Sequence, residues 1–131
     1  MAGSSIVGIG VDAVDIARFR ETLVRTPSMR GRLFTADELT YVDGMSDPAP
    51  SLAVRFAVRE AVMKAMELGI GSFDFHDVEV RREESGAPRL TLSGRAAEHA
   101  AARGIASWHV TLTHSDSTAI AWVVAVGPGS A

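Results

Sequence analysis

The segment 51–66 constrains the fold of this chain more than any other part of the sequence. It contains no glycine or proline and is rich in Ala and Met, so it predicts a helix. Asp47 and Pro48, just upstream, supply an N-cap residue and a proline suited to the first turn, and Gly69 stands where a C-cap glycine is expected. Apolar residues occur nearly all round this helix, which predicts a long central helix covered by the rest of the fold.

Two charged residues of this helix, Glu60 and Lys64, are four positions apart and therefore project from one face. One interpretation is a solvated ion pair, which is common on helices and contributes little to stability. The other is that the carboxylate binds a metal ion while the ammonium binds a phosphate. The apolar surroundings favour the second, because charges on such a helix are seldom without a role.

The bulk composition is that of an ordinary globular protein. With 131 residues and 47% apolar side chains we expect a single domain, 1–131, with flexible tails at 1–4 and 127–131. The absence of cysteine excludes disulfides, thiolate metal sites and cysteine nucleophiles. No apolar run approaches the ~20 residues that span a bilayer, and the first residues lack the features of a signal peptide. We therefore expect a soluble, cytoplasmic protein without a membrane partner.

Positive charge is concentrated between residues 16 and 33. This segment has a net charge of +4, in a chain whose net charge is −3. Such a patch indicates an acidic partner bound at one face, although scattered surface arginines are an alternative. The negative overall charge and the low aromatic content, 6%, argue against nucleic-acid binding. The charged residues of the segment are Arg18, Arg20, Arg25, Arg30 and Arg32 against Glu21.

A short strand is predicted at 6–11, and its two faces differ. Period-two alternation places Val7, Ile9 and Val11 on one face and Gly8, Gly10 and Asp12 on the other. Two glycines on one face indicate that something packs very close there. Asp12 either caps the helix that begins near Asp15 or belongs to a functional site. No third glycine opens that helix, so the pattern is not a dinucleotide-binding fingerprint.

The remaining pattern predicts an α+β fold, in which a mixed or antiparallel sheet packs against the central helix and several short helices. A capping box at Thr35 and Glu38 starts one of the short helices. The predicted helices are 15–24, 29–34, 35–41 and 93–102, the last capped by Ser93, and the predicted strands are 78–82, 89–92, 108–114 and 119–126, with a hairpin turn at 83–88.

His114 ends an apolar strand face at a polar turn, where a histidine is either structural or part of a site. Three polar groups thus end or interrupt apolar elements: Asp12, the pair of Glu60 and Lys64, and His114. Two carboxylates suit Mg²⁺, which keeps several waters and takes further oxygens from substrate phosphates. Lys64 is the kind of point charge that neutralises phosphate. These residues predict an Mg²⁺-dependent site for a phosphate or pyrophosphate ester.

Three blocks in this order resemble the holo-acyl-carrier-protein synthases, the small 4′-phosphopantetheinyl transferases. They are Gly-Ile-Gly-Val-Asp at 8–12 with Arg18 six residues on, Arg-Phe-Ala-Val-Arg-Glu-Ala-Val-Met-Lys-Ala at 55–65, and Thr-Leu-Thr-His at 111–114. Phe34, Thr35 and Glu38 stand between the first two blocks. The resemblance runs the length of the chain and implies the fold of this family.

The resemblance also implies a reaction, in which the phosphopantetheine arm of coenzyme A moves to a serine of an acyl carrier protein and adenosine 3′,5′-bisphosphate is released. Asp12 and Glu60 match the family's Mg²⁺ ligands, and Lys64 matches the lysine that contacts the pyrophosphate. Glu60, directly or through a metal-bound water, is the candidate for deprotonating the serine. Asp12, Glu60 and Lys64 are therefore the expected catalytic residues.

The resemblance implies two further surfaces and an assembly. The family is typically homotrimeric, with each site formed between adjacent subunits, which would explain the glycine face of the first strand only if a neighbour or a substrate packs there. Carrier proteins are acidic, which accounts for the +4 segment. The expected coenzyme A contacts are Lys64, Arg59, Gly86, Pro88 and His114, and the expected carrier-protein contacts are Arg18, Thr22, Arg25 and Met29.

Two positions depart from the family pattern. Arg59 stands where the family usually has lysine, which changes the geometry of a phosphate contact or an ion pair. Ala87 stands where a basic residue is usual, so a contact to the 3′-phosphate is lost or taken over by Arg89. Two other functions stay open: a non-catalytic trimer that binds coenzyme A or a carrier protein, and an Mg²⁺-dependent hydrolase of nucleotide pyrophosphates. The sequence does not distinguish a fatty-acid carrier from a polyketide carrier.

Overall fold

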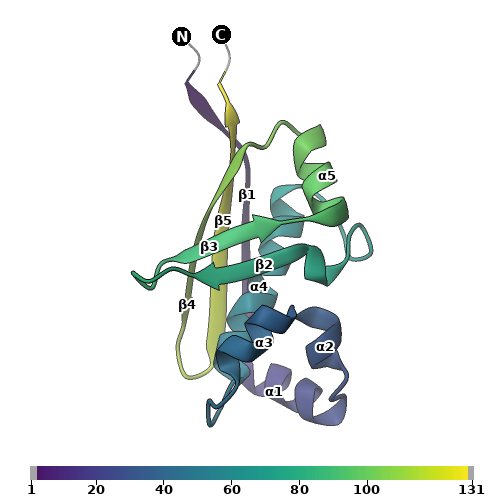
Figure 1. Ribbon diagram of the computed structural model, residues 1–131, viewed down its shortest axis with the longest axis vertical. Coiled ribbons are helices and arrows are strands. Elements are labelled where there is room, and N and C mark those ends of the chain that lie inside the picture. The colour runs from purple at the N-terminus through teal and green to yellow at the C-terminus, as the bar shows by residue number, and fades with distance from the viewer. Residues whose placement is uncertain (1–2, 130–131) are drawn as a thin grey trace.

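The computed structural model describes residues 3–129 and has the predicted α+β architecture (Figure 1). In chain order its elements are β1 (Ser4–Asp15), α1 (Ile16–Arg25), α2 (Met29–Leu33), α3 (Ala36–Val42), α4 (Ala49–Ala65), the 3₁₀ helix η1 (Phe75–Asp77), β2 (Val78–Arg82), β3 (Pro88–Leu92), α5 (Gly94–Ala102), β4 (Ser107–His114) and β5 (Thr118–Pro128). Among the described residues, no helix is both long and apolar enough to cross a lipid bilayer.

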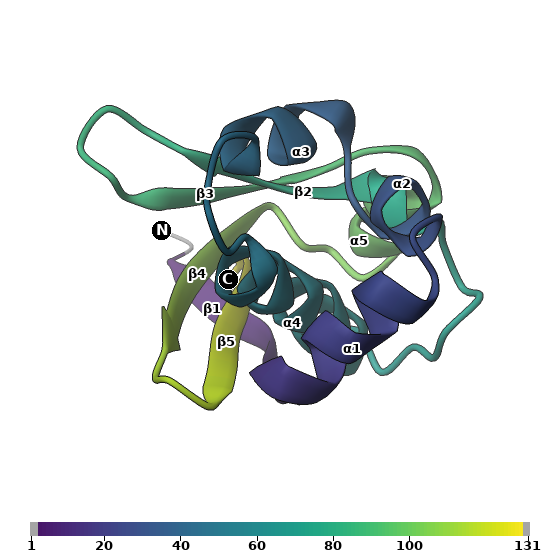
Figure 2. The same ribbon diagram turned by 90° about the horizontal axis from the view of Figure 1, so that it is seen from below.

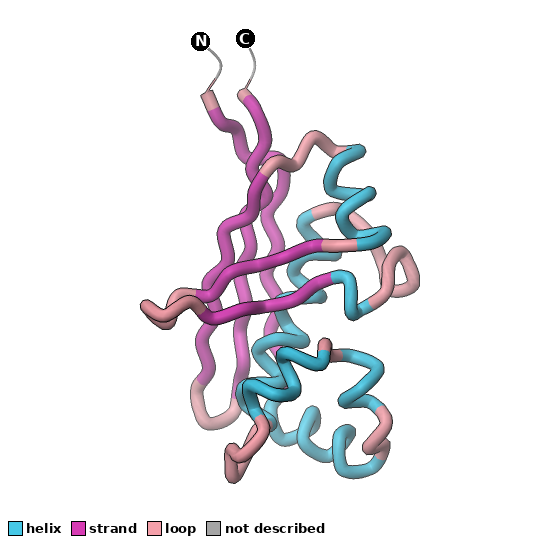
Figure 3. The backbone as a smooth tube through the Cα atoms, in the orientation of Figure 1, coloured by secondary structure: helices cyan, strands magenta, loops and turns pink. Residues whose placement is uncertain are grey.

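Helix α4 is the centre of the fold, as predicted. It lies between a three-stranded antiparallel sheet, in the order β1-β5-β4, and the antiparallel β2–β3 hairpin (Figure 2). Helices α1, α2 and α3 surround one end of α4, and α5 covers the other end (Figure 3). Both hydrophobic clusters include side chains of α4, so burial of this helix links the two halves of the core.

The glycine face of β1 packs against α4 itself. A Cβ atom at Gly10 would lie 1.8 Å from the carbonyl oxygen of Ala61, and one at Gly8 would lie 2.1 Å from that of Ala65. Both positions therefore require glycine, because no side chain fits between the strand and the helix. Neither a neighbouring subunit nor a substrate explains this face, since the chain's own central helix fills it.

The opposite face of the sheet is apolar and exposed. Ile9 and Val11 of β1 are 53% and 44% exposed, and Ile120 and Trp122 of β5 are 37% and 50% exposed. Val11 pairs with Trp122 across the two strands, so these side chains form one patch, called here the outer sheet face. An apolar patch of this kind is typical of a surface that another protein covers.

The helix starts show which polar residues have a capping role. The Asp15 carboxylate accepts from the Arg18 N–H at 2.9 Å, so Asp15 caps α1 and leaves Asp12 free for another role. The predicted capping box of α3 is present. Pro48 is the N-cap residue of α4, and the neighbouring Asp47 accepts from the Ala49 N–H at 3.3 Å, so Asp47 was wrongly assigned as the cap.

The end of α4 also differs from the prediction. Glu67, at φ 58°, adopts the left-handed conformation that was expected of Gly69. The Leu68 N–H donates to the Met63 carbonyl at 2.8 Å, and the Glu67 N–H donates to the Lys64 carbonyl at 3.1 Å, which completes a Schellman motif. The left-handed residue thus comes two positions before Gly69, because the hydrogen bonds of Glu67 and Leu68 satisfy the last helical carbonyls.

Two further predictions are corrected. Ser93 makes no capping hydrogen bond to α5, because the Asp77 carboxylate accepts from the Ala96 N–H at 3.3 Å instead. Strand pairing extends into both predicted tails, with Ser4 opposite Pro128 and Ser5 opposite Gly127, since backbone groups there find partners across the strands. The other tail residues, 1–2 and 130–131, lie outside the described part of the chain.

A buried ion pair connects α4 with α3 and the hairpin. Arg59 and Glu38 have fully buried side chains, and the Arg59 guanidinium donates to both Glu38 carboxylate oxygens. The Glu38 carboxylate also accepts from the Val80 N–H at 3.1 Å and the Thr35 N–H at 3.0 Å. Glu38 therefore satisfies donors on three elements at once, which offsets the cost of burying its charge.

We expect Gly10→Ala to lower the free energy of unfolding by about 2–3 kcal/mol or more, because the added methyl group must displace α4 from β1. Gly31→Ala is the matched control, since a Cβ at Gly31 meets no atom within 4 Å. The control should change stability by at most about 1 kcal/mol. Urea unfolding followed by circular dichroism measures both, and equal stability of the two variants would contradict the close packing of β1 on α4.

Candidate active site

Asp12, Glu60 and Lys64 come together where β1 leaves the surface of α4. The two elements run antiparallel, so Asp12 lies beyond the contact between Gly10 and Ala61. The Lys64 Nζ donates to an Asp12 carboxylate oxygen at 3.0 Å and to the Val11 carbonyl at 3.1 Å. Asp12 and Glu60 line the same cavity, of about 360 Å³.

The structure excludes one of the two interpretations of the charged pair on α4, the ion pair between Glu60 and Lys64. Lys64 forms its ion pair with Asp12, and the described residues contain no salt bridge between Glu60 and Lys64. The lysine side chain points toward the start of the helix and so reaches β1. The pair is therefore not a solvated contact within one helix, because it belongs to a cluster made by two elements.

The Glu60 carboxylate is in an environment that opposes its charge. Partial burial raises its pKa, the nearby Asp12 carboxylate raises it further, and Lys64 lowers it in part. A divalent cation beside the two carboxylates would relieve their repulsion, so the donor set fits a hard metal ion. In residues 3–129, no group of three or more His, Asp or Glu side chains could hold a metal by itself. Further ligands would have to come from water or a substrate.

Two of the predicted carrier-protein residues line this same cavity. Arg18 and Thr22, from α1, line it together with Asp12 and Glu60, and Phe19 and Phe56 are among its apolar lining residues. The sequence predicted that α1 is basic, but it did not predict that α1 forms a wall of the carboxylate site. An acidic molecule bound to α1 would therefore lie next to Glu60.

The other two predicted carrier-protein residues lie further along this surface. Arg25 is exposed at the end of α1, and Met29 is half-buried in α2. Met29 lines an apolar cavity of about 550 Å³ together with Phe56, Phe73 and Ile70. Ile70 is 74% exposed, so this cavity continues into an apolar surface beside the arginines.

A second group of polar residues lies on the β4 side of α4. His114 is exposed and lines a cavity of about 330 Å³ with Arg55, Arg82 and Tyr41. Arg82 also donates to the carbonyl of Gly86 at 2.8 Å, which connects this cavity with the hairpin turn. Gly86 has φ 88° at that turn, and Pro88 begins the return strand. The predicted residues Gly86, Pro88 and His114 thus lie on one side of the molecule.

Arg55 belongs to this second group, although the sequence did not assign it a role. Its side chain is buried, and its Nε has no hydrogen-bond partner. Burial lowers the pKa of Arg55, and the charge of Arg82 lowers it further, whereas Glu38 raises it. The guanidinium lies 4.7 Å from the centre of the Tyr41 ring. These cations favour an anion in the cavity. The sequence signal that could have identified Arg55 was its charge on an otherwise apolar helix.

Arg59 is not available to a ligand, so its assignment to the coenzyme A site was wrong. Its residue is 0% exposed, and its guanidinium donates to Glu38, to the Phe75 carbonyl at 2.9 Å and to the Arg55 carbonyl at 3.2 Å. Arg59 lies one residue from Glu60 and therefore points about 100° away around the helix, toward α3. The forked guanidinium, which a lysine lacks, binds both Glu38 oxygens.

Ala87 and Arg89 lie near the hairpin turn. Ala87 is exposed and presents no charge. Arg89 forms an ion pair with Glu83 across the turn, with 65% of its side chain exposed. The ion pair uses the Arg89 Nε.

The two groups of predicted site residues do not meet within one chain. Asp12 lies on β1 and His114 on β4, and β5 separates these edge strands. Since neighbouring strands are about 4.8 Å apart, the edge strands are about 10 Å apart, and the two groups line different cavities. One chain therefore has two separate groups of polar residues, one with carboxylates and one with cations.

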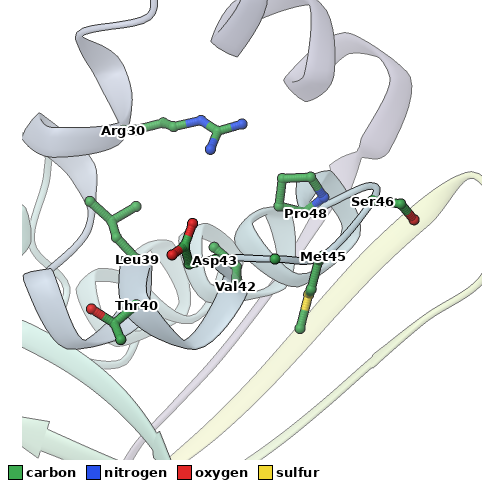
Figure 4. A pocket seen from close by; sticks show the side chains of 9 residues that line it. Arg30, Leu39, Thr40, Val42, Asp43, Met45, Ser46 and Pro48 are labelled. Atoms are coloured by element: carbon green, nitrogen blue, oxygen red, sulfur yellow. The ribbon is translucent and has the colours of Figure 1, made fainter.

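A further cavity, of about 570 Å³, lies beside α3 and the loop before α4 (Figure 4). Arg30 extends over it from α2, and Asp43 and Met45 line it from the loop. None of the predicted catalytic residues lines this cavity, so its size does not make it the active site.

Comparison with known proteins shows the family of this chain. The model of the 4′-phosphopantetheinyl transferase superfamily matches residues 8–123, and the chain belongs to this family. A holo-(acyl-carrier-protein) synthase of Streptomyces avermitilis is 46% identical over 123 residues, which cover 94% of this chain and 99% of that protein.

Solved structures of similar proteins have the same fold. The holo-(acyl-carrier-protein) synthase of Neisseria meningitidis has a TM-score of 0.84 at 28% identity and covers 92% of this chain and 98% of its own. The Helicobacter pylori enzyme of the same name was solved in complex with coenzyme A. It has a TM-score of 0.78 at 31% identity and covers 89% of this chain and 98% of its own.

Proposed function

We propose that this chain is a holo-(acyl-carrier-protein) synthase, which transfers the 4′-phosphopantetheine of coenzyme A to a serine of an apo acyl carrier protein and releases adenosine 3′,5′-bisphosphate. The observation that supports this most is one cavity lined by Asp12, Glu60, Arg18 and Thr22, with Lys64 bonded to Asp12. Carboxylates, an ammonium and a basic helix are thus adjacent. The names of the curated relatives, and the coenzyme A in the Helicobacter pylori structure, agree with the proposal.

Each residue of the carboxylate cluster has a defined part. Asp12 and Glu60 would hold Mg²⁺, which supplies positive charge to the phosphates when bound. Lys64 binds the pyrophosphate through its ammonium. Glu60 accepts the proton of the serine hydroxyl, directly or through a metal-bound water.

The carrier protein binds along α1 and α2. Their arginines give this segment a charge of +4, which complements the acidic surface expected of the carrier. Thr22 and Arg18 lie at the cavity of Glu60, and Met29 lies at the neighbouring apolar cavity, which could accept an apolar side chain of the carrier. In this arrangement the serine reaches Glu60 when the carrier occupies both surfaces.

The active form is a homotrimer, in which each site combines the carboxylate cavity of one subunit with the cationic cavity of the next. The outer sheet face supports this, because four large apolar side chains are exposed there together. The separation of the two half-sites supports it as well, since a nucleotide with a 3′-phosphate and a pyrophosphate needs both the cations at Arg55 and the cluster at Lys64. Cytoplasmic location and a role in fatty acid biosynthesis remain predictions.

Mass spectrometry of an apo carrier protein, incubated with this protein, coenzyme A and Mg²⁺, tests the function. Carrier that gains the mass of phosphopantetheine supports the proposal, and removal of the metal with EDTA should stop the gain. Cleavage of coenzyme A without modified carrier would instead identify a pyrophosphate hydrolase. Binding without chemistry would identify a non-catalytic paralogue. Assays with fatty-acid and polyketide carriers would show which is preferred.

Arg18→Glu should raise the KM for carrier protein about tenfold or more, because it replaces an attractive charge with a repulsive one at the docking surface. The KM should also depend less on salt, while the KM for coenzyme A changes less than about twofold. Arg95→Glu is the matched control, since Arg95 is exposed on α5 at the other end of α4. Equal carrier KM values for the two variants would exclude α1 as the docking surface.

Mixing two inactive variants tests the composite site. Asp12→Ala damages the carboxylate half-site, and Arg82→Ala with His114→Ala damages the cationic half-site; all three changes leave the buried core intact. Random mixed trimers should regain about a quarter of the wild-type activity, because one pairing in four joins two intact halves. No recovery in trimers of confirmed mass would mean that each site lies within one chain.

Trp122→Glu should lower the mass measured by light scattering.

A further inference from the structure

Glu67 occupies a position that suits its residue type poorly in two respects. It has φ 58°, and it is the one non-glycine residue with positive φ in residues 3–129. It also follows the last turn of α4, where the partial negative charge of the helix end disfavours a carboxylate. No ion pair compensates for this within the part of the chain that the structure describes. A residue that is locally unfavourable and unpaired is a candidate for a functional role.

The surroundings of Glu67 connect it to the substrate-binding lysine. Glu67, Lys64 and Arg103 line one cavity of about 330 Å³ beside the backbone of β1. Arg103 is held in place because its Nε donates to the Met66 carbonyl at 3.0 Å and its Nη1 donates to the His99 carbonyl at 3.1 Å. Lys64 and Arg103 are thus the cationic residues of the lining, with the Lys64 ammonium bonded to Asp12, and Glu67 is the one acidic residue of the lining.

We propose that Glu67 determines the affinity of this site for nucleotides, by lowering the positive potential that Lys64 and Arg103 create. The inference rests on the proposed function, which places the pyrophosphate of coenzyme A at Lys64. A carboxylate near that phosphate weakens the binding of coenzyme A. It weakens the binding of adenosine 3′,5′-bisphosphate as well, because that product keeps two phosphate groups.

Two substitutions separate the charge of Glu67 from its backbone conformation. Glu67→Gln removes the charge and keeps the unfavourable φ, whereas Glu67→Gly removes both. Calorimetric titration with adenosine 3′,5′-bisphosphate should give a Kd about three- to tenfold lower for both variants at low salt, and the difference should shrink at high salt. The KM for coenzyme A should fall by a similar factor. Only the glycine variant should also have a higher Tm, because glycine adopts positive φ without strain.

Glu98→Gln is the matched control. It removes a carboxylate from the exposed side of α5, and Glu98 lines none of the cavities described above. Its Kd for the bisphosphate should equal that of the wild type. An unchanged or higher Kd for Glu67→Gln would overturn the inference, and so would a change confined to Glu67→Gly. If the wild-type protein transfers phosphopantetheine in that case, the proposed function stands and only the role of Glu67 is rejected.

Discussion

The contact between the glycine face of β1 and helix α4 determines the rest of the structure. Gly8 and Gly10 allow the strand to touch the helix backbone at Ala65 and Ala61. Asp12 is next on this face, and the approach places it beside Lys64 and in the cavity of Glu60. A larger residue at either glycine would separate the elements and hence the charged groups. The same packing that buries α4 therefore assembles the carboxylate cluster.

Helix α4 carries four charges that the fold uses in three different ways. Arg59 is neutralised in the interior by Glu38 and joins α4 to α3 and the hairpin. Glu60 and Lys64 face β1, where Asp12 completes an anionic cluster. Arg55 faces the β4 side and lacks a partner for its Nε. One buried helix thus presents a carboxylate half-site and a cationic half-site on different sides, which is the physical reason for proposing that subunits share sites.

Much of the fold could be predicted from sequence, because local patterns decide it. Three local patterns predicted elements that the structure contains. The alternation of glycine and apolar residues predicted β1, the capping box at Thr35 predicted the start of α3, and the apolar character of α4 predicted a central helix. The partner of the glycine face and the interior position of Arg59 could not be predicted, since both depend on contacts between segments far apart in the chain. The left-handed Glu67 was missed because composition favours Gly69 at a helix end.

Anomalous diffraction from crystals containing Mn²⁺ in place of Mg²⁺ tests the central claim most directly. The account predicts one peak about 2.1 Å from oxygen atoms of both Asp12 and Glu60 of the same subunit, next to the ammonium of Lys64. A peak bound by only one of these carboxylates, or a metal held elsewhere in a protein that transfers phosphopantetheine, would contradict it.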